Sequence, residues 1–268
     1  MARFADTAAA VLSYAKTLPQ STYISFLGFL LGVAGVLVSF QYAILRIIPA
    51  EFTLRYIYLN VNAPTLSAMF LNNYMHNPMD ASHIASNLPA TVFLIAAVFT
   101  AGTILLPAFG CRMPQGFFPA TYLVFFLLLP FPISGISIWS ARIMGKVWSS
   151  GFSGINYALL GLLFFLMLSR LYIGTLRDTG RDACRSAFAL LLGTFLLLAL
   201  AILFIFIDLH ATHINVYAHL GGFLLGLIVP ALVGLLLSAE DARQKALAAA
   251  MIGLVVLAPA VGWLAMPY

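Results

Sequence analysis

Two short motifs in an otherwise apolar chain contain residue types that together can carry out nucleophilic chemistry. Ser153 stands in Gly-Phe-Ser-Gly at 151–154, and His219 stands in Ala-His-Leu-Gly-Gly at 218–222. A serine hydroxyl attacks at neutral pH only when a neighbouring base accepts its proton, and an imidazole can be that base. We therefore predict that Ser153 is a nucleophile and that His219 activates it.

Small residues beside both groups predict that their helices approach each other closely. Gly222 and Gly226 follow His219 at i+3 and i+7, so the helix face that carries the imidazole has no side chains to hold a neighbour away. A small-xxx-small spacing of this kind permits close backbone contact between membrane helices. Gly154, next to Ser153, likewise has no side chain and leaves room for the facing helix. We expect these glycines to be packing residues of the site.

Tyr157 is the residue best placed to hold the imidazole of His219. It follows Ser153 by four residues, or about one helical turn, and can stack on the ring. No Asp or Glu is positioned to orient the ring as a third catalytic group. The pattern therefore predicts a Ser-His dyad.

The negative charge that develops during acyl transfer needs hydrogen-bond donors. His83 and Asn87 lie four residues apart, and so on one face of a predicted helix. We expect the Asn87 amide, the His83 ring and the backbone N–H of Ser153 to be these donors. Gly151 belongs to the same group of oxyanion- or substrate-stabilising residues. This chemistry needs no metal and no organic cofactor.

Each motif alone also has an ordinary structural interpretation. Gly-x-Ser-Gly can serve helix packing, Tyr157 can be a packing aromatic, and His83 and Asn87 can be interfacial groups wetted by water. His210 and His213 fit a solvated loop, because no third ligand stands at metal-site spacing. The catalytic hypothesis therefore depends on the joint placement of the motifs.

The elements that must position these residues cross a membrane. Of 268 residues, 63% are apolar and 8% are charged, against about 25% charged in a soluble domain. So few charges exclude a water-soluble globule. The basic residues are scattered and form no patch, which argues against nucleic acid as a partner. Cys111 and Cys184 match neither a disulfide framework nor a metal-binding pattern.

Seven segments are long and apolar enough to span a bilayer, which takes about 20 residues. The predicted spans are 24–46, 84–106, 117–138, 152–169, 186–207, 216–237 and 246–265. The first 20 residues carry charges around a short Ala-rich run, and we expect an interfacial or flexible leader there.

Charge in the loops predicts the orientation, because Lys and Arg accumulate on the cytoplasmic side. One side has nine such residues, namely Arg3, Lys16, Arg112, Arg170, Arg177, Arg181, Arg185, Arg243 and Lys245. The other has four, namely Arg46, Arg55, Arg142 and Lys146. The N-terminus is therefore expected in the cytoplasm, and the three polar motifs at the outer ends of their helices.

All eight acidic residues fall in loops or tails, so a proton relay built on buried carboxylates has no candidate residues. A transporter that uses the outer histidines for a metal would also fit seven helices. The absence of carboxylates from the predicted spans disfavours it.

Taken together, the motifs resemble those of the rhomboid family of intramembrane serine proteases. In that family a serine in Gly-x-Ser-Gly begins the fourth core helix, and Ala-His-x-x-Gly-x-x-x-Gly on the sixth supplies the base. A His-x-x-x-Asn pair on the second helix contacts the oxyanion, and a tyrosine four residues after the nucleophile packs against the base. The matching residues here are Ser153, His219, His83, Asn87 and Tyr157.

The resemblance implies an all-α polytopic membrane protein with a six-helix core and a seventh, C-terminal transmembrane helix. It divides the chain into a cytoplasmic leader (1–23), a catalytic core (24–237), and a loop with the seventh helix (238–268). The sequence departs from the family pattern at Leu54-Arg55, where a Trp-Arg pair is frequent. The family usually has a further histidine upstream of the His-x-x-x-Asn pair. Here His76 stands seven residues before His83, a looser spacing than the family pattern.

The implied function is a serine endopeptidase that cleaves transmembrane segments of membrane proteins near the outer membrane face. Its partners would be transmembrane protein substrates and membrane lipid, and its location the plasma (inner) membrane. The alternative is a catalytically silent relative that binds transmembrane clients without cutting them.

Overall fold

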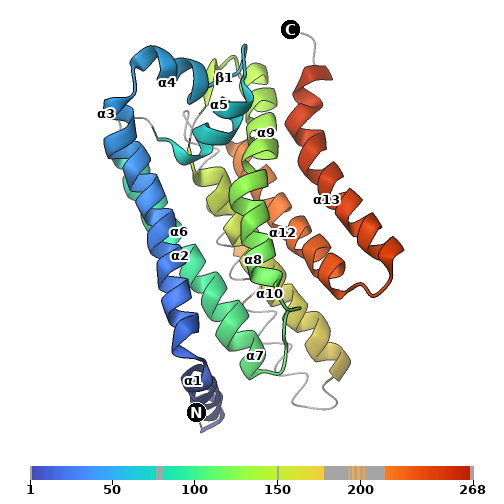
Figure 1. Cartoon of the computed structure of the whole chain (residues 1–268). Coiled ribbons are helices and arrows are strands. Elements are labelled where there is room, and N and C mark those ends of the chain that lie inside the picture. The colour runs from blue at the N-terminus through green and yellow to red at the C-terminus, as the bar shows by residue number, and fades with distance from the viewer. Residues whose placement is uncertain are drawn as a thin grey trace.

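The described part of the chain is a bundle of apolar helices (Figure 1). The computed structural model describes residues 2–76, 81–149, 151–177 and 215–265, together with positions 193, 195, 198, 199 and 202. Within these residues, four helices are long and apolar enough to cross a membrane, and a bent pair provides a fifth crossing if it is counted as one span. The protein is therefore an all-α membrane protein. Most of the predicted span 186–207 lies outside the described residues.

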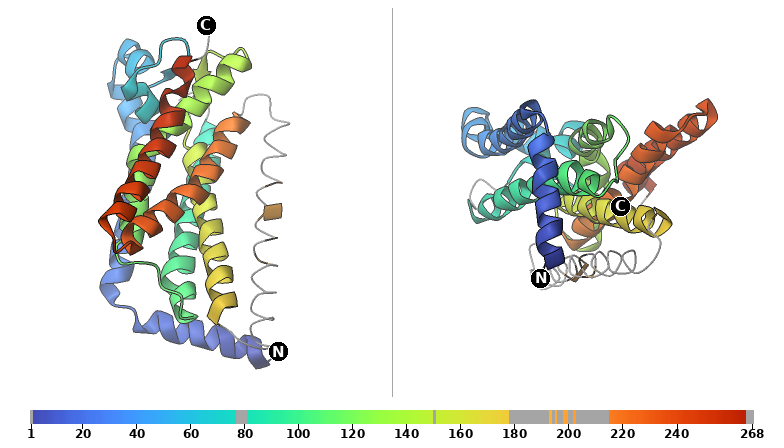
Figure 2. Two further views of the ribbon diagram at one scale, coloured as in Figure 1. Left: turned by 90° about the vertical axis from the view of Figure 1, so that its right-hand side faces the viewer. Right: turned by 90° about the horizontal axis from the view of Figure 1, so that it is seen from below.

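The first helix lies across one end of the bundle. Helix α1 (Ala2–Thr17) lies across the end of α2 (Gln20–Ser39), as Figure 2 shows. Pro19 ends the first helix and caps the second, because proline has no N–H to continue a helical hydrogen-bond pattern. The Tyr23 hydroxyl donates to the carbonyl of Ala15 at 2.6 Å and fixes the corner. The predicted leader is thus a helix across the bundle end.

A partly helical segment follows the first long helix at the opposite end of the bundle (Figure 1). Its elements are η1 (Phe40–Ile44), α3 (Leu45–Ile47), α4 (Ala50–Tyr56), β1 (Leu59–Asn60), α5 (Leu66–Leu71) and η2 (Asn72–Tyr74). Strand β1 pairs antiparallel with β2 (Trp148–Ser149), with Leu59 opposite Ser149. This pairing ties the segment to the chain just before Ser153.

The remaining helices cross or line the core. They are α6 (Ala81–Phe99), η3 (Thr100–Leu105), α7 (Leu106–Ala108), α8 (Phe117–Leu123), η4 (Val124–Leu128), α9 (Pro130–Ile143), α10 (Ser153–Arg177), α12 (Val216–Ser238), α13 (Ala242–Gly262) and η5 (Trp263–Ala265). The predicted span 117–138 is a pair of helices bent by 40°. The bend falls at Pro130, where proline cannot donate to the preceding turn.

Two span boundaries differ from the sequence prediction for a local reason. The first and last spans begin at Gln20 and Ala242, four residues earlier than predicted in each case. The predicted starts of these helices came from hydropathy alone, whereas the residues at the N-cap positions determine where the helices begin. Pro19 caps the first, and the Asp241 side chain caps the last by accepting from the Arg243 N–H at 3.2 Å.

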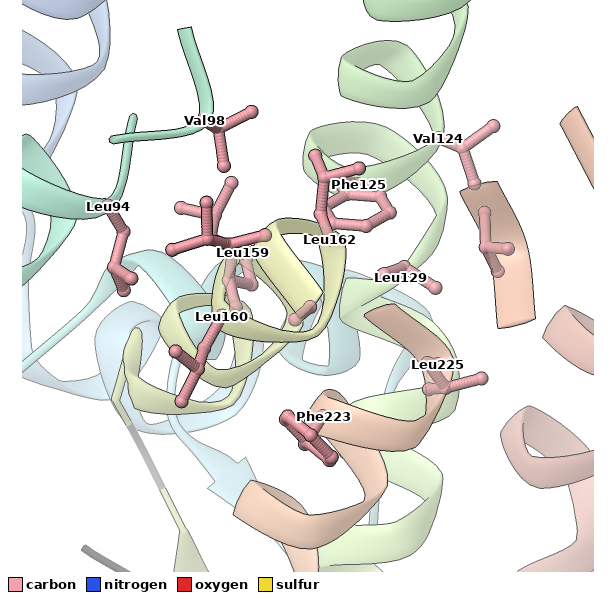
Figure 3. Packing of buried hydrophobic residues seen from close by; sticks show 14 of the residues in the cluster. Leu94, Val98, Val124, Phe125, Leu129, Leu159, Leu160, Leu162, Phe223 and Leu225 are labelled. Carbon is pink, nitrogen blue, oxygen red and sulfur yellow. The ribbon is translucent and has the colours of Figure 1, made fainter. Parts of the chain in front are cut away.

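Helix α10 is the centre of the apolar core. Figure 3 shows side chains from α6, η4 and α12 gathered around it. Its fully buried residues include Ile155, Ala158, Leu159, Leu162 and Leu166. These residues lie on several faces of the helix, and all are covered by other parts of the protein. The helix that begins with Ser153 is therefore enclosed by its neighbours.

Helices α10 and α12 touch backbone to backbone. A methyl group added at Gly222 would lie 2.1 Å from the carbonyl oxygen of Gly154, and one at Gly226 would lie 2.1 Å from that of Ala158. Only glycine permits this approach, because a Cβ atom would overlap the facing main chain. The spacing of Gly222 and Gly226 predicts a close contact of this kind.

Replacing Gly222 with Ala should force α10 and α12 apart, because the facing Gly154 carbonyl belongs to a helix backbone and cannot rotate away. Overpacking of this kind costs about 1–3 kcal/mol. The control is Gly253→Ala in α13, where the added methyl group meets nothing within 4 Å. Thermal unfolding in mild detergent should show a lower midpoint for Gly222→Ala only. Equal midpoints would contradict the tight packing.

Candidate active site

The side chains of Ser153 and His219 meet at the neighbouring ends of two helices. Ser153 is the first residue of α10, and His219 lies in the first turn of α12. The His219 Nε2 atom lies 2.6 Å from the Ser153 Oγ atom, which is a hydrogen-bond distance. His219 is buried and Ser153 is half-buried. With Nε2 unprotonated, the serine hydroxyl donates to it, as proton abstraction requires.

The imidazole of His219 is held from one side by an aromatic ring. Tyr157 stacks on it with ring centroids 4.5 Å apart and an interplanar angle of 16°. Tyr157 follows Ser153 by one turn of α10, so one helix supplies both the hydroxyl and the stacking partner. Stacking and the hydrogen bond together restrict the orientation of the ring.

The start of α12 is anchored to α9 by a residue that the sequence analysis missed. Asn215 caps α12, and its Oδ1 atom accepts from the Ala218 N–H at 3.3 Å and from the Ser140 hydroxyl at 2.8 Å. Its Nδ2 donates to the carbonyl of Ser137 at 3.4 Å. The turn that carries His219 is thereby fixed in place. An Asn just before an apolar run is a typical N-cap and was the available signal.

The loop before Ser153 is held by the segment that follows α5. Gly151 has φ of 132°, a backbone conformation that favours glycine. Its N–H donates to the carbonyl of Asn72 at 3.1 Å. In this conformation, therefore, Gly151 shapes the turn into α10 and its N–H is engaged with Asn72 rather than free for an oxyanion.

Behind this loop lies a buried polar cluster formed by Asn72, Asn73 and Ser134. The side-chain amides of Asn72 and Asn73 donate to the Ser134 Oγ atom at 2.8 and 2.9 Å. The Ser134 hydroxyl donates in turn to the carbonyl of Met69 at 2.6 Å. Both lone pairs and the proton of Ser134 are thus used, as burial requires.

Tyr74 adds a further link between this segment and the bundle. Its hydroxyl donates to the carbonyl of Phe126. Burial raises the pKa of the Tyr74 phenol, so the group stays protonated and remains a donor.

Asn87 is buried in α6 and contacts α10. Its Oδ1 atom accepts from the side-chain amide of Asn156 at 3.1 Å. His83 lies in the first turn of the same helix, and its side chain lies outside the described part of the chain. His76 is fully buried beyond η2. The predicted loop histidines His210 and His213 also fall outside the described residues.

Comparison with known proteins yields no relative, because no protein-family model, curated protein or solved structure matches the chain. The site is therefore defined by its own geometry. That geometry brings Ser153, His219 and Tyr157 together beside the glycine contact of α10 and α12.

The stack of Tyr157 on His219 should be visible by NMR, because an aromatic face shifts the signals of protons above it upfield. In micelles, with histidines isotopically labelled, the His219 ring protons should lie upfield of those of exposed histidines. Tyr157→Phe keeps the ring and should preserve the shift, whereas Tyr157→Ala should abolish it. His219→Ala assigns the signal. An unshifted signal in the unmodified protein would rule out the stack.

Proposed function

We propose that this protein is a rhomboid-type intramembrane serine endopeptidase that cleaves transmembrane segments of membrane proteins near the outer membrane face. The observation that carries the proposal is the 2.6 Å contact between Ser153 Oγ and His219 Nε2 inside a bundle of apolar helices. The stacked Tyr157 ring and the sequence motifs shared with that family support it.

In this mechanism the Ser153 hydroxyl oxygen attacks the carbonyl carbon of the substrate peptide, and its proton passes to Nε2 of His219. The imidazolium then donates that proton to the departing amine, and the peptide bond breaks. Water next attacks the acyl-serine, again losing its proton to His219. Release of the new carboxyl end restores the Ser153 hydroxyl.

The oxyanion formed in each step requires donors. The Asn87 amide is one candidate, and the backbone N–H of Ser153 is another, because the first N–H groups of a helix have no intrahelical acceptor. The positive end of the α10 dipole favours the same charge. The His83 ring remains a further candidate donor.

Ser153 is the first residue of α10 and is half-exposed, so its hydroxyl is open to water and to a substrate. A substrate helix must unwind there, since its carbonyls are engaged in its own hydrogen bonds.

Labelling with a fluorescent fluorophosphonate in mild detergent tests the dyad. The unmodified protein should be labelled and should cleave a model transmembrane substrate, while Ser153→Ala and His219→Ala should do neither. Ser169→Ala is the matched control, because Ser169 lies on the same helix and donates only to the carbonyl of Phe165 at 2.8 Å. Cleavage by Ser153→Ala would exclude this mechanism. A folded protein without labelling or cleavage would favour the client-binding alternative.

Asn87→Ala should slow cleavage without abolishing it, because it removes one oxyanion donor and leaves the dyad. Loss of one such donor lowers kcat by about a hundred- to a thousandfold in a related chemistry. Steady-state kinetics on the model substrate measure the effect, with Ser169→Ala as the reference. An unchanged kcat would remove Asn87 from the proposed site.

A further inference from the structure

A polar network joins α10 to α6, next to the side of α10 that contacts His219. Asn156 follows Ser153 by three residues and is buried, as are Asn87 and Thr91 in α6. Asn156 and Tyr157 lie one turn below Ser153, and they face different helices. Tyr157 stacks on His219, whereas Asn156 bonds to Asn87. Ser153 therefore begins a helix whose next turn touches both the proposed base and the proposed oxyanion donor.

The hydrogen bonds of this network determine which way both amides point. The Asn156 Nδ2 atom lies 3.2 Å from the backbone carbonyl of Asn87, and a carbonyl can only accept. The Asn156 Oδ1 atom accepts from the Thr91 hydroxyl at 2.7 Å. The Thr91 hydroxyl also lies 2.8 Å from the Asn87 carbonyl, so its single proton is shared between that carbonyl and Asn156 Oδ1.

The orientation of the Asn156 amide determines the orientation of the Asn87 side chain. Because the Asn156 amide presents its N–H groups to α6, the Asn87 atom facing it at 3.1 Å must be the acceptor, Oδ1. The Nδ2 group of Asn87 is then the end directed away from Asn156. It donates to no acceptor among the described residues.

We propose that Asn156, braced by Thr91, is a positioning residue that holds the Asn87 amide with its N–H end available to the oxyanion. This assignment rests on the proposed function and goes beyond it, since neither residue belongs to the dyad. Without Asn156 the Asn87 amide can turn over and present Oδ1, whose negative partial charge would repel the oxyanion. Preorganised donors stabilise a transition state because they need no such reorientation.

The test is a double-mutant cycle on kcat and KM for the model transmembrane substrate. Asn156→Leu should lower kcat by about tenfold or more and change KM by less than about twofold, because the missing contact acts on the transition state. In the Asn87→Ala background the same substitution should have no further effect. A structural role would instead lower kcat by the same factor in both backgrounds.

Thr91→Val provides a second variant that does not alter Asn156 itself. It should lower kcat in the same direction as Asn156→Leu, and by a smaller factor. Thr121→Val is its matched control, because Thr121 is fully buried and its hydroxyl makes no hydrogen bond within the described chain. That control should leave kcat unchanged. Equal losses for the two Thr→Val variants would overturn the assignment.

The outcomes separate this inference from the proposed function. If the unmodified protein neither reacts with the fluorophosphonate nor cleaves the model substrate, both the proposed function and the role of Asn156 are wrong. An active protein in which Asn156→Leu leaves kcat unchanged, or acts equally with and without the Asn87 side chain, would overturn the role of Asn156 alone. Thermal unfolding of each variant in the same detergent verifies that the compared proteins are folded.

Discussion

The backbone contact between α10 and α12 is the constraint on which the candidate site depends. The carbonyl group of Gly154 faces the Cα atom of Gly222, so the two helices are closer than side chains would permit. Ser153 immediately precedes one of these glycines, and His219 stands three residues before the other. Their separation is therefore set by main-chain packing, which varies far less than the rotamers of two long side chains would.

The same contact makes α10 a support for the whole site. Its first turns carry the hydroxyl of Ser153 and the ring of Tyr157, which both contact His219 on α12, and the amide of Asn156, which faces Asn87 on α6. Polar groups enclosed by apolar helices are costly unless they are hydrogen-bonded. The amide network with Thr91 meets that requirement on the α6 side. Burial thus favours a single arrangement of these groups.

The parts of this arrangement that local sequence could predict are those that repeat with the helical period. Gly222 and Gly226 share a face with His219, and Tyr157 shares one with Ser153, so the glycine contact was predictable from spacing alone. The pairing of β1 with β2, the Asn72–Ser134 bond and the Asn156–Asn87 bond were not predicted. Each joins residues more than 60 positions apart, and a single Asn or Ser in an apolar run does not reveal its partner.

Energetics argue that the Ser153–His219 pair is not needed to hold the helices together. Hydrogen bonds between membrane helices contribute on average only about 0.6 kcal/mol, whereas close backbone packing at small residues is itself a main source of helix association. A serine–histidine hydrogen bond that served only to join the two helices could equally lie in the middle of the α10–α12 contact, away from water. The Ser153–His219 pair lies at the end of the contact, where Ser153 is half-exposed and the His219 ring is stacked on Tyr157. Its position fits a group that must meet water and substrate.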